Sequence, residues 1–111
     1  MSELDRQVAE AAGYHVIGGV LPNDHDYWAD QYRNFVEAVY RFHPSTYFDQ
    51  IIELVQAEKW AFNIYWAGHP NPKVEVFDPH RGFFGADIEG TDICAALCTA
   101  YLKAKKDHPP G

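Results

Sequence analysis

Histidines beside carboxylates are the residues in this chain that could bind a metal ion. His25 lies between two aspartates, and His80 follows Asp78 by two positions. Imidazole nitrogens and carboxylate oxygens are ligands for zinc and related metals. Neither spacing matches a known metal motif, and an Asp-His-Asp run is explained more simply as the capped start of a helix. The sequence therefore predicts no metal ion and no cofactor, and leaves open whether His25, His69 or His80 binds one.

Two cysteines are the next candidates for chemistry. Cys94 and Cys98 lie four positions apart, so a helix would carry both on one face. A shared metal would need a second pair of ligands at suitable spacing, and a nucleophilic Cys-His pair would need His69 or His80 to fold back over that helix. Free cysteine more commonly behaves as a small apolar side chain in a core. We predict reduced, buried thiols and a protein that is not an enzyme.

The segment from Asp78 to Gly90 contains three glycines and one proline, which predicts a long loop. Long loops in compact domains often carry function. Phe83 and Phe84 lie between glycines, where they would pack poorly, so we expect them to be exposed anchors for a protein partner. The predicted partner-binding residues are Asp78, His80, Arg81, Phe83, Phe84, Asp87 and Glu89.

The charge of the chain indicates which partners suit it. Its formal net charge is −7 and its pI is about 5.2. Binding to nucleic-acid phosphates needs clustered Lys and Arg, so nucleic acid is not the expected partner. A basic surface on a host protein fits better, with the acids around the predicted loop mimicking nucleic acid or occupying a basic groove. The alternative is a small molecule or nucleotide held by aromatic faces and Arg81.

Most other acids have a simpler interpretation, because they fall mainly on the polar faces of predicted helices. There they would keep a surface hydrated without any further role. These residues are Glu3, Asp5, Glu10, Asp30, Glu37, Glu53 and Glu58.

The first half of the chain is expected to form one short helix and one longer helix. A helix is expected over residues 3–12, with Ser2 as its cap and Gly13 as its end. Residues 14–21 are ambiguous between a short strand and an irregular connection. A second helix is expected from about residue 24 or 26 to Phe42, ended by Pro44, because apolar residues recur at a period of 3.6. They are Trp28, Tyr32, Phe35, Val36 and Val39.

The second half predicts a helix, a hairpin and a helix. Ser45 can cap a helix whose buried stripe is Phe48, Ile51, Ile52 and Val55. From Trp60 the apolar period changes to 2, which predicts a hairpin of strands at about 60–66 and 73–77. Thr91 can cap a last helix that runs to about residue 106. We therefore expect a single α+β domain over 1–111, with a small antiparallel sheet packed between helices.

No apolar stretch approaches the roughly 20 residues that span a bilayer. The first residues also lack the basic and apolar runs of a secretory signal. The expected setting is cytoplasmic, without a membrane. An exposed strand edge would permit a homodimer without requiring one.

Part of the chain resembles the phage ABA sandwich domain. The resemblance covers residues 45–106 and rests on the runs YFDQIIELVQAEKWAFNIYW, KVEVF and GADIEGTDICAALCTAYLKAKK. It implies a sheet flanked by helices in a phage or prophage protein, and it carries over no catalytic residue. The expected function is that of an accessory protein in the host bacterium that binds a host macromolecule, most concretely an inhibitor of a bacterial defence complex.

Overall fold

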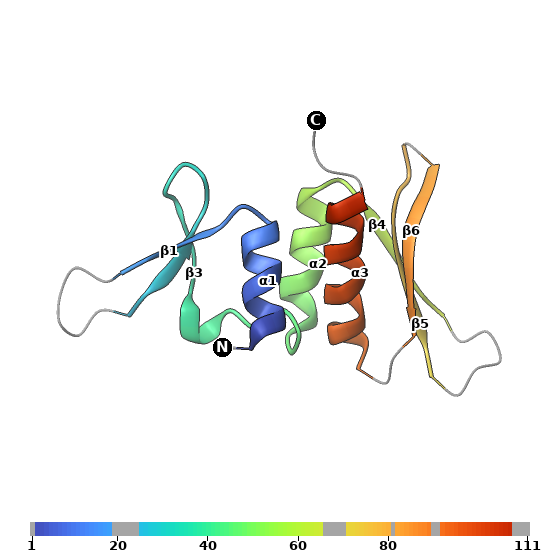
Figure 1. The fold of residues 1–111 in the computed structure, drawn as a ribbon, viewed down its shortest axis with the longest axis horizontal. Coiled ribbons are helices and arrows are strands. Elements are labelled where there is room, and N and C mark those ends of the chain that lie inside the picture. The colour runs from blue at the N-terminus through green and yellow to red at the C-terminus, as the bar shows by residue number, and fades with distance from the viewer. Residues whose placement is uncertain (1, 19–24, 66–70, 81, 90–91, 108–111) are drawn as a thin grey trace.

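In the described part of the chain, three α-helices lie in the middle of the molecule, with a small antiparallel sheet at each end (Figure 1). The computed structural model describes residues 2–18, 25–65, 71–80, 82–89 and 92–107, with 82–89 described by their backbone only. The molecule is elongated, with extents of 53 × 33 × 18 Å. The predicted α+β class is confirmed. The layer order is a finding of the structure, because the helices lie between two sheets and the sequence predicted only one.

The first helix matches its prediction at both ends. α1 spans Glu3–Ala11, and the Ser2 hydroxyl oxygen accepts the backbone N–H of Asp5. At the other end Gly13 has φ +87° and donates to the Glu10 carbonyl, while Tyr14 donates to the Ala9 carbonyl. This pair of bonds is a Schellman motif, which satisfies the last carbonyls of a helix. The motif fixes where Tyr14 leaves the helix.

The helix predicted from residue 24 or 26 to Phe42 is wrong. The described part of this segment contains β2 (Tyr27–Ala29), β3 (Phe35–Ala38) and a short 3-10 helix, η1 (Val39–Arg41). β2 pairs antiparallel with β3 and with β1 (His15–Ile17), which forms the first sheet in the order β1-β2-β3.

The turn between β2 and β3 explains the error. The Asp30 carboxylate accepts hydrogen bonds from the backbone N–H groups of Tyr32 at 2.8 Å and Asn34 at 2.9 Å. Arg33 takes a positive φ of 65°. An aspartate that binds its own backbone in this way favours a turn over a helix. The aromatic and β-branched residues that mimicked a helical period also pack well on a sheet.

The helix expected after Pro44 is confirmed, although it begins later than predicted. α2 spans Phe48–Ala57 and has no side-chain cap, so Ser45 does not cap it. Ile51 and Val55 are buried as expected, but Phe48 is 43% exposed. α2 also ends in a Schellman motif, in which Lys59 occupies the left-handed position with φ 61°.

The predicted hairpin is confirmed and extended. β4 (Ala61–Tyr65) pairs antiparallel with β5 (Lys73–Asp78), which also pairs with β6 (Gly82–Glu89) to form the second sheet. The loop predicted over residues 78–90 is therefore wrong. Glycine is common in loops, but within a strand it also accompanies irregular pairing. The register of β5 and β6 shifts between Val76 and Asp78.

The last helix, α3 (Ile93–Asp107), packs against the second sheet and the other helices (Figure 1). Its first turn is capped by the Asp92 carboxylate, which accepts the backbone N–H of Ala95; the predicted cap, Thr91, lies outside the described residues. Leu97, Ala100 and Tyr101 are buried. One buried cluster joins α3 to both sheets, and it includes Val8, Trp28, Phe42, Ile51, Val55, Val74, Val76, Leu97 and Tyr101. Within the described ranges, no helix has the length and apolar character needed to cross a membrane.

Candidate functional site

The residues predicted to bind a partner are spread along a strand and are not gathered in a loop. Asp78 ends β5, and its carboxylate accepts the backbone N–H of the exposed His80 at 2.8 Å. Phe83, Phe84, Asp87 and Glu89 all belong to the eight-residue β6, whose register sets Asp87 opposite Glu75 and Glu89 opposite Lys73. Arg81 lies outside the described residues. The structure thus removes the loop on which this site was predicted.

The histidine candidates do not form a metal centre within the described part of the chain. There, no group of three or more His, Cys, Asp or Glu side chains is placed to hold a metal ion. His25 is exposed and its ring lies 4.8 Å from the ring of Tyr40. His69 is outside the described residues.

The two cysteines are poor nucleophiles. Both are free; Cys98 is buried and Cys94 is half-buried. Burial raises the pKa of Cys98, and the pKa of Cys94 is raised by burial and by the carboxylates of Asp92 and Asp49. The thiolate is the reactive form of cysteine, so a raised pKa makes both side chains less reactive.

A histidine and a buried aspartate lie together in the arrangement found in catalytic triads. The Oδ2 atom of Asp5 is 3.4 Å from Nδ1 of His43. In a triad, the other ring nitrogen must be free to accept a proton from a nucleophile. Here Nε2 of His43 is 2.9 Å from the backbone carbonyl of Tyr40, to which it donates. The pair therefore holds the chain in place and is not placed to act as a general base.

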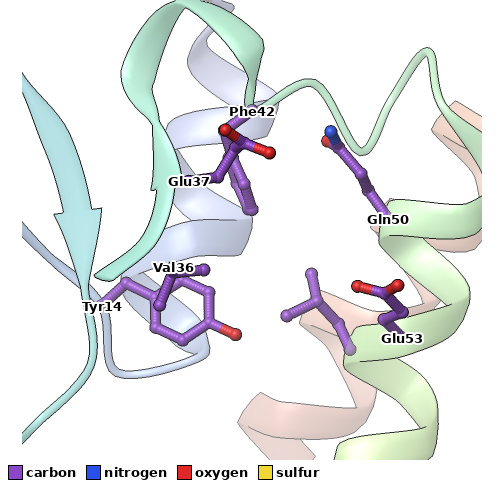
Figure 2. Close-up of a pocket in the computed structure, with 7 residues that line it drawn as sticks. Tyr14, Val36, Glu37, Phe42, Gln50 and Glu53 are labelled. Carbon is purple, nitrogen blue, oxygen red and sulfur yellow. The ribbon is translucent and has the colours of Figure 1, made fainter. Parts of the chain in front are cut away.

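A cavity of about 280 Å³ that carries polar groups lies between the first sheet and α2. We call it the inner cavity. Figure 2 shows Tyr14 and Glu37 on the side of the sheet, facing Gln50 and Glu53 on α2 across the open space. Its seven lining residues are Tyr14, Val36, Glu37, Phe42, Gln50, Glu53 and Leu54.

The lining residues come from separate elements that local structure holds in place. Tyr14 follows the Schellman motif of α1, while Glu37 comes from β3. On α2, Gln50, Glu53 and Leu54 follow the i, i+3, i+4 spacing that puts side chains on one helix face. Because the two sides belong to different elements, the cavity exists only in the folded chain.

Phe42 forms the apolar floor of the inner cavity. Its side chain is 3% exposed, and its ring lies 6.1 Å from the ring of Tyr14 and 6.1 Å from that of Trp28. Gln50 fixes the adjoining wall: its amide oxygen accepts the backbone N–H of His43 at 2.7 Å, and its amide nitrogen donates to the carbonyl of Arg41 at 2.8 Å. The floor and this wall are therefore held before any ligand arrives.

The inner cavity is electronegative. Glu37 and Glu53 are its charged lining residues, and none of the seven is Lys or Arg. One Glu37 oxygen accepts the backbone N–H of Ala38, but among the described residues the Glu53 carboxylate and the Tyr14 hydroxyl have no hydrogen-bond partner. Burial and the carboxylates of Asp30, Glu53 and Glu58 raise the pKa of Tyr14. These groups favour a cation in the space that they surround.

A wider groove of about 480 Å³ adjoins the inner cavity and shares Glu37 and Gln50 with it. We call it the outer groove; its other lining residues are Tyr40, Arg41, Tyr47 and Asp49. Tyr40 is 53% exposed and Tyr47 is 49% exposed. The Arg41 guanidinium lies 5.4 Å from the centre of the Tyr40 ring. The two spaces together carry three carboxylates and one guanidinium, beside exposed tyrosines.

Sequence reasoning missed this site. It assigned Glu37 to a helix, whereas Glu37 belongs to β3, and it left Tyr14 in an ambiguous segment. The assignment of Glu53 to the exposed face of a helix is confirmed, but it did not indicate that this face borders a cavity. The available signal was the pair Tyr40 and Tyr47 on either side of Pro44, because tyrosine is enriched in binding surfaces. No family model, curated protein or solved structure matches this chain, so the site is interpreted from its own residues.

Proposed function

We propose that this protein acts by binding a partner protein that presents a basic surface, and that the inner cavity and outer groove receive that surface. The observation that carries the proposal is the pair of carboxylates, Glu37 and Glu53, on opposite sides of a cavity with an apolar floor. Opposite charge steers association and suppresses wrong partners, while a buried apolar floor supplies affinity.

The exposed tyrosines beside the site favour a protein partner over a small molecule. Pockets for drug-sized ligands usually have volumes of about 300–1,000 Å³; the inner cavity lies just below that range at about 280 Å³ and the outer groove within it at about 480 Å³, so volume alone does not separate the two kinds of partner. The inner cavity opens beside a groove that is flanked by Tyr40 and Tyr47. Tyrosine is enriched among residues that dominate binding energy at protein interfaces. A protruding side chain with its neighbouring chain fits this shape.

The proposed setting is a phage or prophage accessory protein whose partner belongs to the host bacterium, with a defence complex as the most concrete target. This setting rests on the sequence runs by which residues 45–106 resemble the phage ABA sandwich domain, and not on the layer order, which has helices between two sheets. The raised pKa values of Cys94 and Cys98, and the engagement of both His43 ring nitrogens, support binding without catalysis.

The test compares two double variants with the same net charge. Glu37→Gln with Glu53→Gln removes the carboxylates of the inner cavity, and Glu3→Gln with Glu10→Gln removes two exposed carboxylates from α1. Each tagged protein is used to capture partners from a bacterial lysate at low and at moderate salt, and the captured proteins are identified by mass spectrometry.

We expect the wild type and the α1 variant to capture the same basic protein, and the cavity variant to lose it. Capture should weaken as salt rises, because screening reduces the attraction between exposed charges. A partner that the cavity variant retains at full yield contradicts the assignment of the site. Capture of a nucleotide in place of a protein contradicts the proposed function.

A further inference from the structure

Three oxygen-bearing side chains line the inner cavity on different sides. The carboxylate of Glu37 comes from β3, that of Glu53 from α2, and the hydroxyl of Tyr14 from the segment that follows α1 (Figure 2). Gln50 is already committed to the backbone at Arg41 and His43. An ammonium group carries three donors, so it can donate to acceptors on different sides of such a cavity.

The apolar lining suits the rest of a lysine side chain. Val36, Phe42 and Leu54 line the same cavity. Lysine commonly lays its four-carbon stem along apolar surface while its charged end remains with polar groups. An arginine fits less well, because its planar guanidinium favours one carboxylate in a bidentate, coplanar arrangement. Here the two carboxylates stand on opposite sides of the space.

We infer that the inner cavity receives a single unmodified lysine side chain of the partner, with its ammonium between Glu37, Glu53 and Tyr14. This inference rests on the proposed function, because it names the group by which a basic partner is recognised. It further implies that acetylation of that lysine prevents binding, since acetylation removes the charge and two donors.

The probe is Nα-acetyl-lysine N-methylamide, a blocked lysine, titrated into the ¹⁵N-labelled full chain and followed by ¹H–¹⁵N NMR. We expect saturable shifts in the millimolar range, centred on the backbone amides of Tyr14, Val36, Gln50 and Glu53. The corresponding blocked arginine should bind several-fold more weakly. The Nε-acetylated lysine and the blocked norleucine should cause no shifts at these amides.

Variants test the role of each acceptor. Glu53→Gln and Glu37→Gln should each weaken binding of the blocked lysine about tenfold, because each removes a charge-assisted hydrogen bond. Tyr14→Phe should weaken it less, and Glu10→Gln on α1 should leave it unchanged. The spectrum of each variant without ligand also reports whether it is folded.

Two results overturn the inference: shifts that do not centre on the cavity, or equal binding of the blocked lysine, arginine and norleucine. Its failure is distinguishable from failure of the proposed function. If the cavity variant loses the lysate partner but the blocked lysine does not bind, the function stands and the lysine assignment falls. If the blocked lysine binds but the Glu37→Gln, Glu53→Gln variant captures the lysate partner as well as the wild type does, the proposed function is wrong.

Discussion

The Asp5 carboxylate accepts a 2.8 Å hydrogen bond from the backbone N–H of Ser45, 40 positions further along the chain. The same carboxylate accepts the Ser2 hydroxyl at 2.8 Å and lies 3.4 Å from the His43 ring. Asp5 is 1% exposed, so the sequence-based assignment of this acid to a solvated helix face is wrong. These bonds tie α1 to the segment that leads into α2, beside the inner cavity.

Asp5→Asn should lower the free energy of unfolding by about 2 kcal/mol, the cost typical of losing hydrogen bonds to a buried charged group. The asparagine side chain can still accept the Ser45 N–H through its amide oxygen. It lacks the negative charge that strengthens the hydrogen bonds from Ser2 and His43. Urea unfolding at pH 6 measures the difference. Asp49→Asn, at an exposed position in the first turn of α2, is the control and should change stability much less. Equal effects of the two changes would contradict a special role for Asp5.

The effect of Asp5 should depend on pH in a defined direction. Burial alone would raise the pKa of Asp5, but hydrogen bonds from Ser45, Ser2 and His43 lower it below its ordinary value of 3.8. A lowered pKa in the folded state means that the contribution is present above pH 3.8 and is lost as pH falls through the folded value. The stability gap between wild type and Asp5→Asn should therefore narrow below pH 3.8. A gap that stays constant from pH 6 to pH 2 would refute this linkage.

Lys59→Gly should stabilise the protein by about 0.5–1 kcal/mol. Lys59 occupies the left-handed position that ends α2, with φ 61°, and a side chain there costs energy that glycine avoids. Gly13 occupies the same position after α1, with φ +87°. A Cβ atom added at Gly13 would have no other atom within 4 Å. Gly13→Ala should therefore destabilise through backbone strain alone. Thermal unfolding of Lys59→Gly and of Gly13→Ala measures both effects. Changes of Tm in the same direction for the two variants would contradict this prediction.

Glu58 and Lys105 should show a measurable energetic coupling. Lys105 Nζ donates to the Glu58 carboxylate at 2.9 Å, with side-chain exposures of 15% and 26%, and Tyr101 hydrogen-bonds the same glutamate. A double-mutant cycle with Glu58→Gln and Lys105→Met should give about 1–2 kcal/mol, above the usual value for a surface pair. The exposed Arg6–Glu10 pair on α1 serves as a comparison and should couple less strongly.

The two thiols should differ in their rates of alkylation. Cys98 is buried and its pKa is raised by burial, while Cys94 is half-buried with a pKa that is raised for the same reason. At pH 7 iodoacetamide should modify Cys94 slowly and Cys98 only after unfolding. Peptide mass spectrometry over time measures both. Rapid modification of either residue in the native protein would reveal an activated thiolate and reopen the enzyme interpretation.

The sequence by itself determined the elements whose signals are local. α1 follows from its periodicity, its Ser2 cap and its Gly13 end, while α2, the β4–β5 hairpin and α3 follow from the periodicity of their apolar residues. Such signals depend on neighbours a few positions away, so they can be read from one segment alone. The net charge also indicated that a partner would have a basic surface, and this inference remains a proposal.

Only the tertiary structure decided the rest, because it depends on contacts between distant segments. The spacing of apolar residues in 27–38 is compatible with a helix and with a hairpin. The segment forms strands because β2 pairs with both β1 and β3. Residues 82–89 form a strand because β5 offers a partner for their backbone. The inner cavity joins Tyr14, Glu37 and Glu53 from three separate segments, so no single stretch of sequence contains it. Long-range packing, which no local propensity encodes, created the site.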